Sequence, residues 1–589
     1  LGVRKAAHLR TVREVLRDGR FAGNPRLRAL LVEVEVALGQ VERAAGVLPA
    51  GDDDALTLRA RALVASMHNQ PPRDYLPALA KADDTEVHVF FDDIRLLLDE
   101  SEEVEWAALP AAERAAWIRR KWEWRAMMAG IDVEQRIGEH HRRMKTALET
   151  YPRRGFRGSP PMNSMWLERP GITKQPLDDR GLIYLRHGAP EKEVALLNTR
   201  PRWVRRQLEP IPAPVLAWRY GGTLADGGVF EFAKIDDRSD WFLIEPTPAC
   251  PDAHVLTGGM ASGYTTPGDH RVWSDRLRDL DPARAMYYDR CAMGSAFAAA
   301  HFLTERSESR EQAATAMSTE TAVPRFGRPL AGAVNLYGFR SSRGGELVAY
   351  FGIPGDSLTS RRVATGEEYA LRVRIAGGDP STQQVVQRDT VIRFVQPAAL
   401  PPGAVASTSL SLPLPAGSNS RVVLNVVNGN DTTQGQVMSG MRTIPAASGM
   451  VMSDIVVALD RDGSLQRAGH ALAPALGHVV AAGQNVRVYY ELYGVAANAP
   501  LQVDIEISPG QERSLIGMLQ ELIARKSAVA VQFREAAEPD ASGMQPTLRT
   551  IGLDVEPGRY ELSVKVTNLE TGVAVGGTTG IIVLEGVRR

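Results

Sequence analysis

The sequence predicts a multidomain α+β protein: an α-helical N-terminal domain, a small central α+β domain and two C-terminal antiparallel β-sandwich-like domains. Residues 1–100 are rich in Ala, Leu, Arg and Glu, and their apolar residues recur at helical spacing. From about residue 330 onward, short alternating runs of β-forming residues are separated by turn residues. A stretch at 178–193, with a charged turn, an apolar run and a Gly-x-Pro break, lies between these two kinds of sequence. The length of 589 residues allows three or four domains.

The first 100 residues are expected to form stacked helical hairpins. Leu27, Leu31 and Val34 belong to one apolar stripe, and breaks such as Gly23-Asn24-Pro25 separate the helices. Residues 38–45 resemble the small-residue helix packing of tetratricopeptide-type repeats. A plain α-helical domain explains the same pattern, so both interpretations stay open.

Residues 101–311 are predicted to form the central α+β domain, which contains a tryptophan-rich helix. Pro110 marks the first turn of this helix, and Trp117 and Trp124 lie on one face. Basic residues interleaved with aromatic residues can bind nucleic acid, but the formal net charge of the chain is −1. We therefore expect the tryptophans to anchor a core and the basic residues to line the solvent-facing side. No nucleic-acid partner is expected.

The stretch at 178–193 is predicted to contain a buried strand at residues 182–185. These four apolar residues follow Gly181 and precede the break at Gly188-Ala189-Pro190. With this strand, three later segments would complete a small antiparallel sheet. Those segments are residues 216–220, 229–232 and 241–244.

The rest of the chain is expected to be helical first and then almost entirely β. Residues 281–311 have helical composition, and 312–328 are interpreted as a linker. Residues 329–464 and 465–589 are predicted to be two sandwich-like, immunoglobulin-like domains. No apolar run approaches the roughly 20 residues that span a bilayer, so no transmembrane segment is expected in this chain.

A set of spaced residues resembles the GWxTD-domain family of bacterial proteins. It comprises Glu113-Arg114, Trp122, Arg125, Asp179-Arg180-Gly181, Tyr184 and Gly188-Ala189-Pro190. The five residues that name the family read Gln175-Pro176-Leu177-Asp178-Asp179 here, so only the final Asp is kept. The resemblance implies structural roles for Trp122, Arg125, Asp179, Arg180, Gly181, Tyr184, Gly188 and Pro190. It brings no catalytic residues, and the family's association with exported proteins implies export for this chain.

Arg186-His187-Gly188 resembles the strand-then-Arg-His-Gly motif of histidine phosphatases. In that chemistry the His attacks phosphorus and Arg side chains hold the phosphoryl oxygens. The motif normally opens an α/β domain, whereas β-rich sequence follows here, and no second His has a suitable context. The favoured interpretation is therefore structural: Arg186 and His187 end a strand and hydrogen-bond a neighbouring loop.

No metal or cofactor is expected from the remaining polar clusters. His140 and His141 are adjacent on a predicted helix and point in different directions. Asp252, His254 and His270 lie in a glycine-rich loop without metal-ligand spacing, and the turns at 428–431 and 460–463 are typical β-turns. Cys250 and Cys291 would form a disulfide in an oxidising compartment or remain buried thiols.

Taken together, the sequence predicts a non-catalytic exported interaction or assembly protein. Protein partners or self-assembly are expected, with helical repeats and sandwich edges as the binding surfaces. The chain begins at Leu1 without an initiator Met, so either a segment was removed or the sequence covers only part of the gene product. Together with the family resemblance, this leads us to expect a removed signal segment and a periplasmic, extracellular or cell-surface location. Two alternatives are a phosphoryl-transfer enzyme that uses His187 and Arg186, and a carbohydrate- or peptide-binding module.

Overall fold

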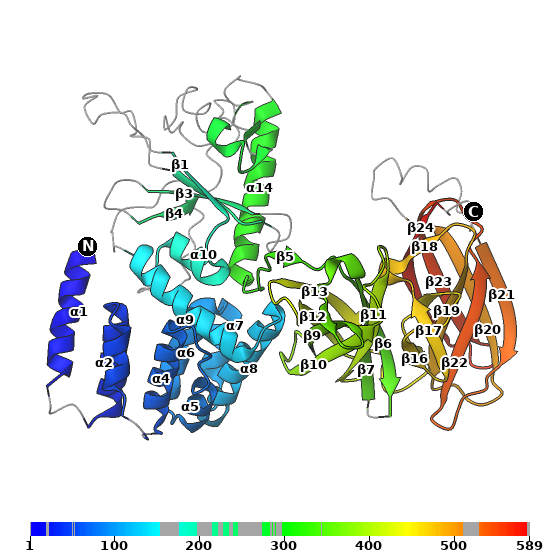
Figure 1. The fold of residues 1–589 in the computed structure, drawn as a ribbon, viewed down its shortest axis with the longest axis horizontal. Coiled ribbons are helices and arrows are strands. Elements are labelled where there is room, and N and C mark those ends of the chain that lie inside the picture. Colours follow the sequence, from blue (N-terminus) through cyan, green and yellow to red (C-terminus); the bar gives the residue numbers. More distant parts are fainter. Residues whose placement is uncertain are drawn as a thin grey trace. The chain divides into compact units, whose positions relative to one another are not determined.

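The structure is a computed structural model that describes residues 2–18, 23–49, 51, 53–153, 176–196, 215–221, 228–234, 240–244, 274–282, 285–286, 289, 297–342, 344–510 and 529–585. It divides into two compact units, Leu1–Val323 and Pro324–Arg589, which are described separately (Figure 1). The described residues of the first unit form helices and one small sheet, and those of the second form mainly strands. An N-terminal helical region followed by antiparallel strands in several sheets is thus confirmed.

The N-terminal part of the first unit is a succession of helices, most of which pack on a sequence neighbour. They are α1 (Gly2–Leu16), α2 (Pro25–Ala37), α3 (Val41–Val47), α4 (Ala55–Met67), α5 (Tyr75–Lys81), α6 (Val87–Ile94), the 3₁₀ turn η2 (Arg95–Leu97), α7 (Glu100–Ala108), α8 (Ala111–Ala129) and α9 (Val133–Thr150). The predicted break before α2 is a helix start, since the Asn24 side chain accepts hydrogen bonds from the N–H groups of Arg26 and Leu27. The helical character predicted for residues 1–100 is confirmed.

Helix α8 buries a different set of residues from the one expected. Trp117 and Trp122 are completely buried, whereas Trp124 is half-buried. Lys121 and Arg125 are buried as well, which corrects the expectation that the basic residues line the solvent-facing side. Their burial is possible because carboxylates from other segments balance their charges, as the contacts of the site show.

The predicted strand at 182–185 is wrong: these residues belong to helix α10 (Asp179–His187). Asp178 caps the helix, because its side chain accepts a hydrogen bond of 3.1 Å from the N–H of Gly181. Gly188 ends it with a φ of +75°, a conformation that favours glycine. A short apolar run bounded by glycines is compatible with a buried strand and with a buried helical turn. The Asp178 cap stabilises the helical conformation.

The other three predicted strands exist, and the first strand of their sheet comes later than expected. The sheet has the order β1-β2-β3-β4 and is antiparallel throughout, with β1 (Lys192–Leu196), β2 (Val215–Arg219), β3 (Val229–Ala233) and β4 (Phe242–Ile244). One shared apolar core joins this sheet to α10 and to α14 (Phe297–Ser318). Figure 1 shows α14 beside the sheet. Because α14 continues to Ser318, the first residues of the predicted linker 312–328 are helical.

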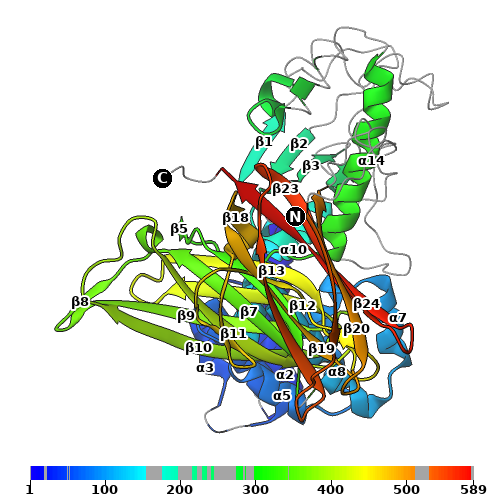
Figure 2. The same cartoon turned by 90° about the vertical axis from the view of Figure 1, so that its right-hand side faces the viewer.

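The first block of the second unit consists of two sheets around one core. The larger has the order β10-β9-β12-β13-β5 with β8 added on β9, and the smaller has the order β11-β7-β6. The strands are β5 (Arg328–Pro329), β6 (Ala333–Ser341), β7 (Gly344–Pro354), β8 (Arg361–Val363), β9 (Gly366–Gly378), β10 (Val385–Gln396), β11 (Val405–Leu414), β12 (Asn419–Asn428) and β13 (Gln434–Thr443). Figure 2 shows β8, β9 and β10 running out to one side of the block.

The second block also has two sheets around one core, with the orders β14-β19-β15-β17-β16 (β22 added on β19) and β18-β24-β23-β20-β21. The strands are β14 (Val451–Met452), β15 (Val456–Leu459), β16 (Leu465–Arg467), β17 (His470–Pro474), β18 (Val479–Ala481), β19 (Asn485–Tyr493), β20 (Pro500–Pro509), β21 (Val529–Ala536), β22 (Met544–Gly552), β23 (Gly558–Asn568) and β24 (Ala574–Leu584). Because β14 and β15 belong here, this block begins before the predicted boundary at 465. The short helix expected at 515–524 lies outside the described residues.

Polar contacts and a shared apolar cluster join the two blocks. Asn335 of β6 donates a hydrogen bond of 2.8 Å to the carbonyl of Ala475 and accepts one of 2.9 Å from the N–H of Gly477. The N–H of Gly338 donates to the Asp454 carboxylate at 2.7 Å. The two blocks are therefore fixed to each other. Among the described residues of the whole chain, no helix combines the length and apolar character needed to cross a membrane.

Candidate functional site

Helix α10 brings most of the residues implied by the family resemblance to one place. Asp179, Arg180, Gly181 and Tyr184 lie on the helix, and Gly188 ends it. A Cβ on Gly181 would lie 2.9 Å from the Cβ of Leu177 and 3.1 Å from the carbonyl oxygen of Tyr151, so this position requires glycine. Pro190 follows the helix and is half-buried, while Trp122 and Arg125 lie on α8.

His187 is buried, and both of its ring nitrogens are engaged within the protein. Nδ1 lies 2.9 Å from Oγ1 of Thr321, and Nε2 lies 2.7 Å from the carbonyl oxygen of Ala316. Since a carbonyl only accepts, Nε2 carries the proton and Nδ1 accepts from the threonine hydroxyl. Burial lowers the pKa of His187 to about 4, so the ring is neutral at physiological pH. In this arrangement neither nitrogen is available to attack a phosphorus atom.

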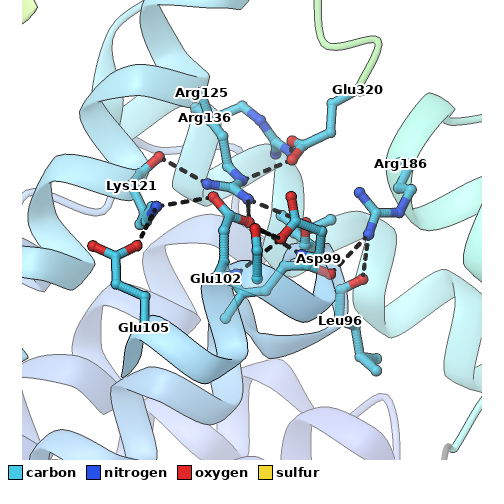
Figure 3. A network of polar contacts seen from close by, with 12 residues as sticks. Leu96, Asp99, Glu102, Glu105, Lys121, Arg125, Arg136, Arg186 and Glu320 are labelled. Atoms are coloured by element: carbon cyan, nitrogen blue, oxygen red, sulfur yellow. Dashed lines mark hydrogen bonds and ion pairs between the residues drawn. The ribbon is translucent and has the colours of Figure 1, made fainter. Parts of the chain in front are cut away.

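Arg186 is also buried and acts as a structural donor. Its Nη2 donates hydrogen bonds to the carbonyls of Leu96 at 3.2 Å and Leu98 at 3.4 Å, which fixes the turn η2 beside α10 (Figure 3). Its guanidinium also contributes to the electrostatic stabilisation of the Glu320 carboxylate. Arg186 and His187 therefore do bond to neighbouring segments, as predicted, but from the end of a helix instead of a strand.

A buried network of charges centres on Glu320, in the segment that follows α14. One carboxylate oxygen accepts a hydrogen bond of 2.7 Å from Nε of Arg125, and the other forms an ion pair with Arg136, which has no exposed surface. Burial pushes the pKa of Glu320 upward, but the guanidinium groups of Arg136, Arg125 and Arg186 outweigh it and bring the pKa to about 2. The carboxylate is therefore ionised at all physiological pH values.

The network extends along α7 and α8 (Figure 3). Glu102 accepts a hydrogen bond of 3.2 Å from Arg125 and pairs with Lys121 at 3.0 Å, and Glu105 pairs with Lys121 at 3.3 Å. The Lys121 ammonium lies 4.7 Å from the centre of the Trp117 ring. Carboxylates thus face the buried cations of α8 along its length, which explains why Lys121 and Arg125 tolerate burial.

Residues 319–321, which follow α14 and are called the strap below, are held against α9 and α10 by hydrogen bonds. The N–H of Thr321 donates to the carbonyl of Arg186 at 3.0 Å, and Nη2 of Arg143 donates to the carbonyl of Thr321 at 2.7 Å. Nη1 of Arg143 donates to the carbonyl of Arg186, also at 2.7 Å. The strap therefore ties the end of the first unit to the helix that carries the candidate residues.

A second polar cluster surrounds the start of α10. Oδ2 of Asp179 accepts a hydrogen bond of 2.7 Å from the N–H of Leu243, which connects the helix to β4. Arg180 donates to Asp178 at 2.7 Å, and Arg153 pairs with Asp240 at 3.5 Å. Burial raises the pKa of Asp179 to about 7 and that of Asp178 to about 6. The cluster joins helix to sheet and contains carboxylates that titrate near neutrality.

The other polar candidates also have structural contacts. Nδ1 of His141 lies 2.9 Å from Oγ of Ser66, and the rings of His140 and His141 have centroids 6.3 Å apart. Burial lowers the pKa of His140 to about 3 and that of His141 to about 4. Among the described residues, no three His, Cys, Asp or Glu side chains are placed to hold a metal ion. Cys250, Cys291, Asp252, His254 and His270 fall outside the described residues.

The acidic loops at 428–431 and 460–463 are occupied by internal contacts. Asp431 accepts hydrogen bonds from the backbone N–H and the hydroxyl of Thr433, which is typical of a turn. Asp460 and Asp462 both pair with Arg487, at 2.8 Å and 3.2 Å. These contacts agree with the turn interpretation of both loops.

Glu320, Thr321 and Arg143 form the centre of the site and were missed by the sequence analysis. Glu320 and Thr321 lie in a segment whose composition indicates only a linker. The available signal was on α9, where Arg136 and His140 are one helical turn apart on a buried face. An arginine in such a position requires a buried acid as its partner.

Comparison with known proteins gives no family for the chain. No protein-family model matches it, and no curated protein matches it. Similar solved structures include Escherichia coli alpha-2-macroglobulin activated by porcine elastase, with 10% identity over 45% of this chain and 23% of that one and a TM-score of 0.15. Red sea bream transglutaminase has 10% identity over 63% of this chain and 51% of its own, with a TM-score of 0.14. The chain thus spans about a quarter and about half of these two structures, and the scores are too low to assign a fold or an activity.

Proposed function

We propose that this chain is a non-catalytic, exported interaction or assembly protein, whose helical part binds protein partners and whose β blocks act as spacers and as edges for strand pairing. The observation that carries the proposal is the state of two edge strands, β10 and β21. Among the described residues each is the last strand of its sheet, and each exposes valines: Val391, Val395 and Val531 are 49%, 44% and 41% exposed. Unpaired backbone together with exposed β-branched side chains suits the addition of another strand.

The site at α10 supports a structural role over catalysis. Arg186 donates to the carbonyls of Leu96 and Leu98, and His187 binds the carbonyl of Ala316 and the hydroxyl of Thr321. Glu320 neutralises the arginines that would otherwise attract an anionic substrate. The same contacts make the helical unit rigid, and a rigid helical array is a suitable support for a binding surface.

Four finer points belong to the proposal. The helices of residues 1–100 form tetratricopeptide-like hairpins, and the two β blocks are sandwich-like domains of the immunoglobulin kind, as their paired sheets around common cores favour. The relationship to the GWxTD-domain family rests on the spaced residues around α8 and α10. The exported location rests on that resemblance alone.

The proposal is tested by measuring, in the cells that produce the chain, whether it forms a complex and with what stoichiometry. The affinity-tagged full chain is cross-linked in the cells and purified, and the mass of the product is measured by light scattering after size-exclusion chromatography. We expect a complex of fixed stoichiometry, made with a second copy or with another protein. A chain that is strictly monomeric and captures no more protein than an unrelated tagged control would refute the proposed function.

A further inference from the structure

We propose that β10 is a self-association edge: β10 of one chain pairs antiparallel with β10 of a second copy about a two-fold axis at Val391. The inference rests on the proposed assembly function and names its partner. In the resulting dimer the two six-stranded sheets of the first blocks join into one continuous sheet. The partner surface is thus the same strand, as a two-fold interface requires.

The outer edge of β10 is long and regular. The strand has 12 residues and pairs along its whole length with β9, from Val385 opposite Gly378 to Gln396 opposite Glu367. Within the described part of the chain, no other strand pairs with it. Its sequence, VVQRDTVIRFVQ, contains no Pro, which would interrupt an edge, and its charged residues include both signs, so that they can pair with a second copy of the strand.

Geometry restricts the registers in which β10 can pair with itself. In an antiparallel pair, residues that face each other must point to the same side of the sheet. For two copies of one strand, this requires the two-fold axis to pass through a residue and not between two residues. The registers near the middle of the strand are therefore those centred on Thr390, Val391 or Ile392.

The charges of β10 select one of these registers. With the axis at Val391, Asp389 of each copy lies opposite Arg393 of the other, so two ion pairs flank a Val391–Val391 contact. With the axis at Thr390, Asp389 faces Val391; with the axis at Ile392, Asp389 faces Val395. Only the register at Val391 pairs opposite charges, and it also places the exposed Val391 against its own copy.

The other side of the strand is compatible with this register. Arg388 lies opposite Phe394 of the second copy, which places a guanidinium beside an aromatic ring. Thr390 lies opposite Ile392, a pair of β-branched residues.

Asp389 is held in one conformation by an ion pair with β9. Its carboxylate accepts two hydrogen bonds from Arg374 of β9, at 2.6 Å and 2.7 Å, and it remains 54% exposed. In the dimer the carboxylate lies between Arg374 of its own chain and Arg393 of the second copy. A fixed acceptor loses little side-chain freedom on binding, which favours association.

The test uses charge reversal in the purified full chain, with light scattering and sedimentation to measure its mass. The wild-type chain is expected to be a dimer at micromolar concentration. R393D places Asp opposite Asp389, and D389R places Arg opposite Arg393, so each single variant is expected to weaken the dimer about tenfold or more.

A 1:1 mixture of the two variants restores both ion pairs and is expected to form a heterodimer. R559D, which makes the same charge change on β23 of the second block, is the matched control and should leave the dimer intact.

Hydrogen exchange of the β10 backbone gives a second readout that does not depend on variants. The outward N–H groups of β10 are expected to gain protection as wild-type concentration increases. The inference is overturned by a monomeric wild-type chain, by a dimer that survives both single reversals, or by a mixture that stays monomeric while both variants remain folded. A monomeric chain that still forms a fixed complex with another protein overturns this inference alone. A monomeric chain without any complex overturns the proposed function as well.

Discussion

The carboxylate of Glu320 accepts a hydrogen bond of 2.7 Å from Nε of Arg125, a residue 195 positions earlier in the chain. The other oxygen binds Arg136, whose side chain is completely buried. A buried guanidinium depends on its partner, because it has no water to solvate its charge. The contact therefore makes the fold of α8 and α9 depend on a residue that follows α14.

Replacing Glu320 by Gln should destabilise the first unit by about 3–5 kcal/mol, because it leaves the charges of Arg125 and Arg136 buried without a counter-charge. Chemical unfolding followed by tryptophan fluorescence measures this effect selectively. All nine tryptophans lie in the first unit, so their emission reports on that unit alone.

Glu311→Gln is the matched control for this experiment. Glu311 is an exposed residue of α14, and its replacement should change the unfolding free energy by less than about 0.5 kcal/mol. Equal stability of the Glu320 and Glu311 variants would contradict the assigned role of Glu320.

Local sequence patterns predicted the positions of the secondary-structure elements better than they predicted whether each is a helix or a strand. The segment around Leu182 was correctly predicted to be buried, yet its four apolar residues are compatible with both element types. The contact that distinguishes a helix from a strand here is the helix cap between the Asp178 side chain and the N–H of Gly181. In the sequence, the same charged residues are also typical of a turn. The alternation typical of strands in the second unit is a stronger signal, since it repeats over many residues.

The candidate site could be predicted only in part, because its contacts are distant in sequence. Arg186 and His187 were recognised as groups that bond to neighbouring segments, but Thr321, the partner of His187, lies 134 positions away. No periodicity or turn signal connects two such positions in a single sequence. The burial of Arg125 depends in the same way on Glu320, which belongs to a segment without a recognisable pattern.

Asp179 should make the stability of the first unit depend on pH. Its pKa is about 7 in the fold and about 3.9 in an unfolded chain, so the folded state binds this proton more tightly. The stability that the proton contributes is fully present below pH 4 and is lost as the pH rises through 7. In Asp179→Asn, the amide oxygen can still accept the hydrogen bond from Leu243, but the buried charge is gone.

The unfolding free energy of Asp179→Asn relative to wild type should therefore increase by up to about 4 kcal/mol between pH 4 and pH 8. Tryptophan fluorescence in urea at a series of pH values measures the difference. Two parallel stability curves would show that Asp179 titrates alike in the folded and unfolded states.

His187→Ala should leave any hydrolysis of p-nitrophenyl phosphate unchanged, because both ring nitrogens bind the protein itself. The same variant should lower the unfolding free energy by about 1–3 kcal/mol, since the buried hydroxyl of Thr321 loses its partner. Activity assays on the full chain and fluorescence-detected unfolding provide the two measurements. Wild-type turnover that disappears in a folded His187→Ala variant would instead favour the phosphoryl-transfer alternative.

Arg467 should hold the two β blocks together, and Arg467→Met should loosen them. Its guanidinium donates two hydrogen bonds of 2.9 Å to Glu491 of the second block and one of 2.7 Å to Glu346 of the first. Glu491 is completely buried, so the loss of Arg467 should cost about 3 kcal/mol or more. Glu491→Gln in the same chain should recover part of that loss by removing the unpaired charge.

Faster hydrogen exchange in β6, β7 and β19 of the single Arg467→Met variant is the expected result. Arg487→Met, at an exposed pair of the second block, is the control and should leave exchange in these strands unaffected. Unchanged exchange in Arg467→Met would mean that the apolar cluster around Phe339 and Tyr489 is sufficient to join the blocks.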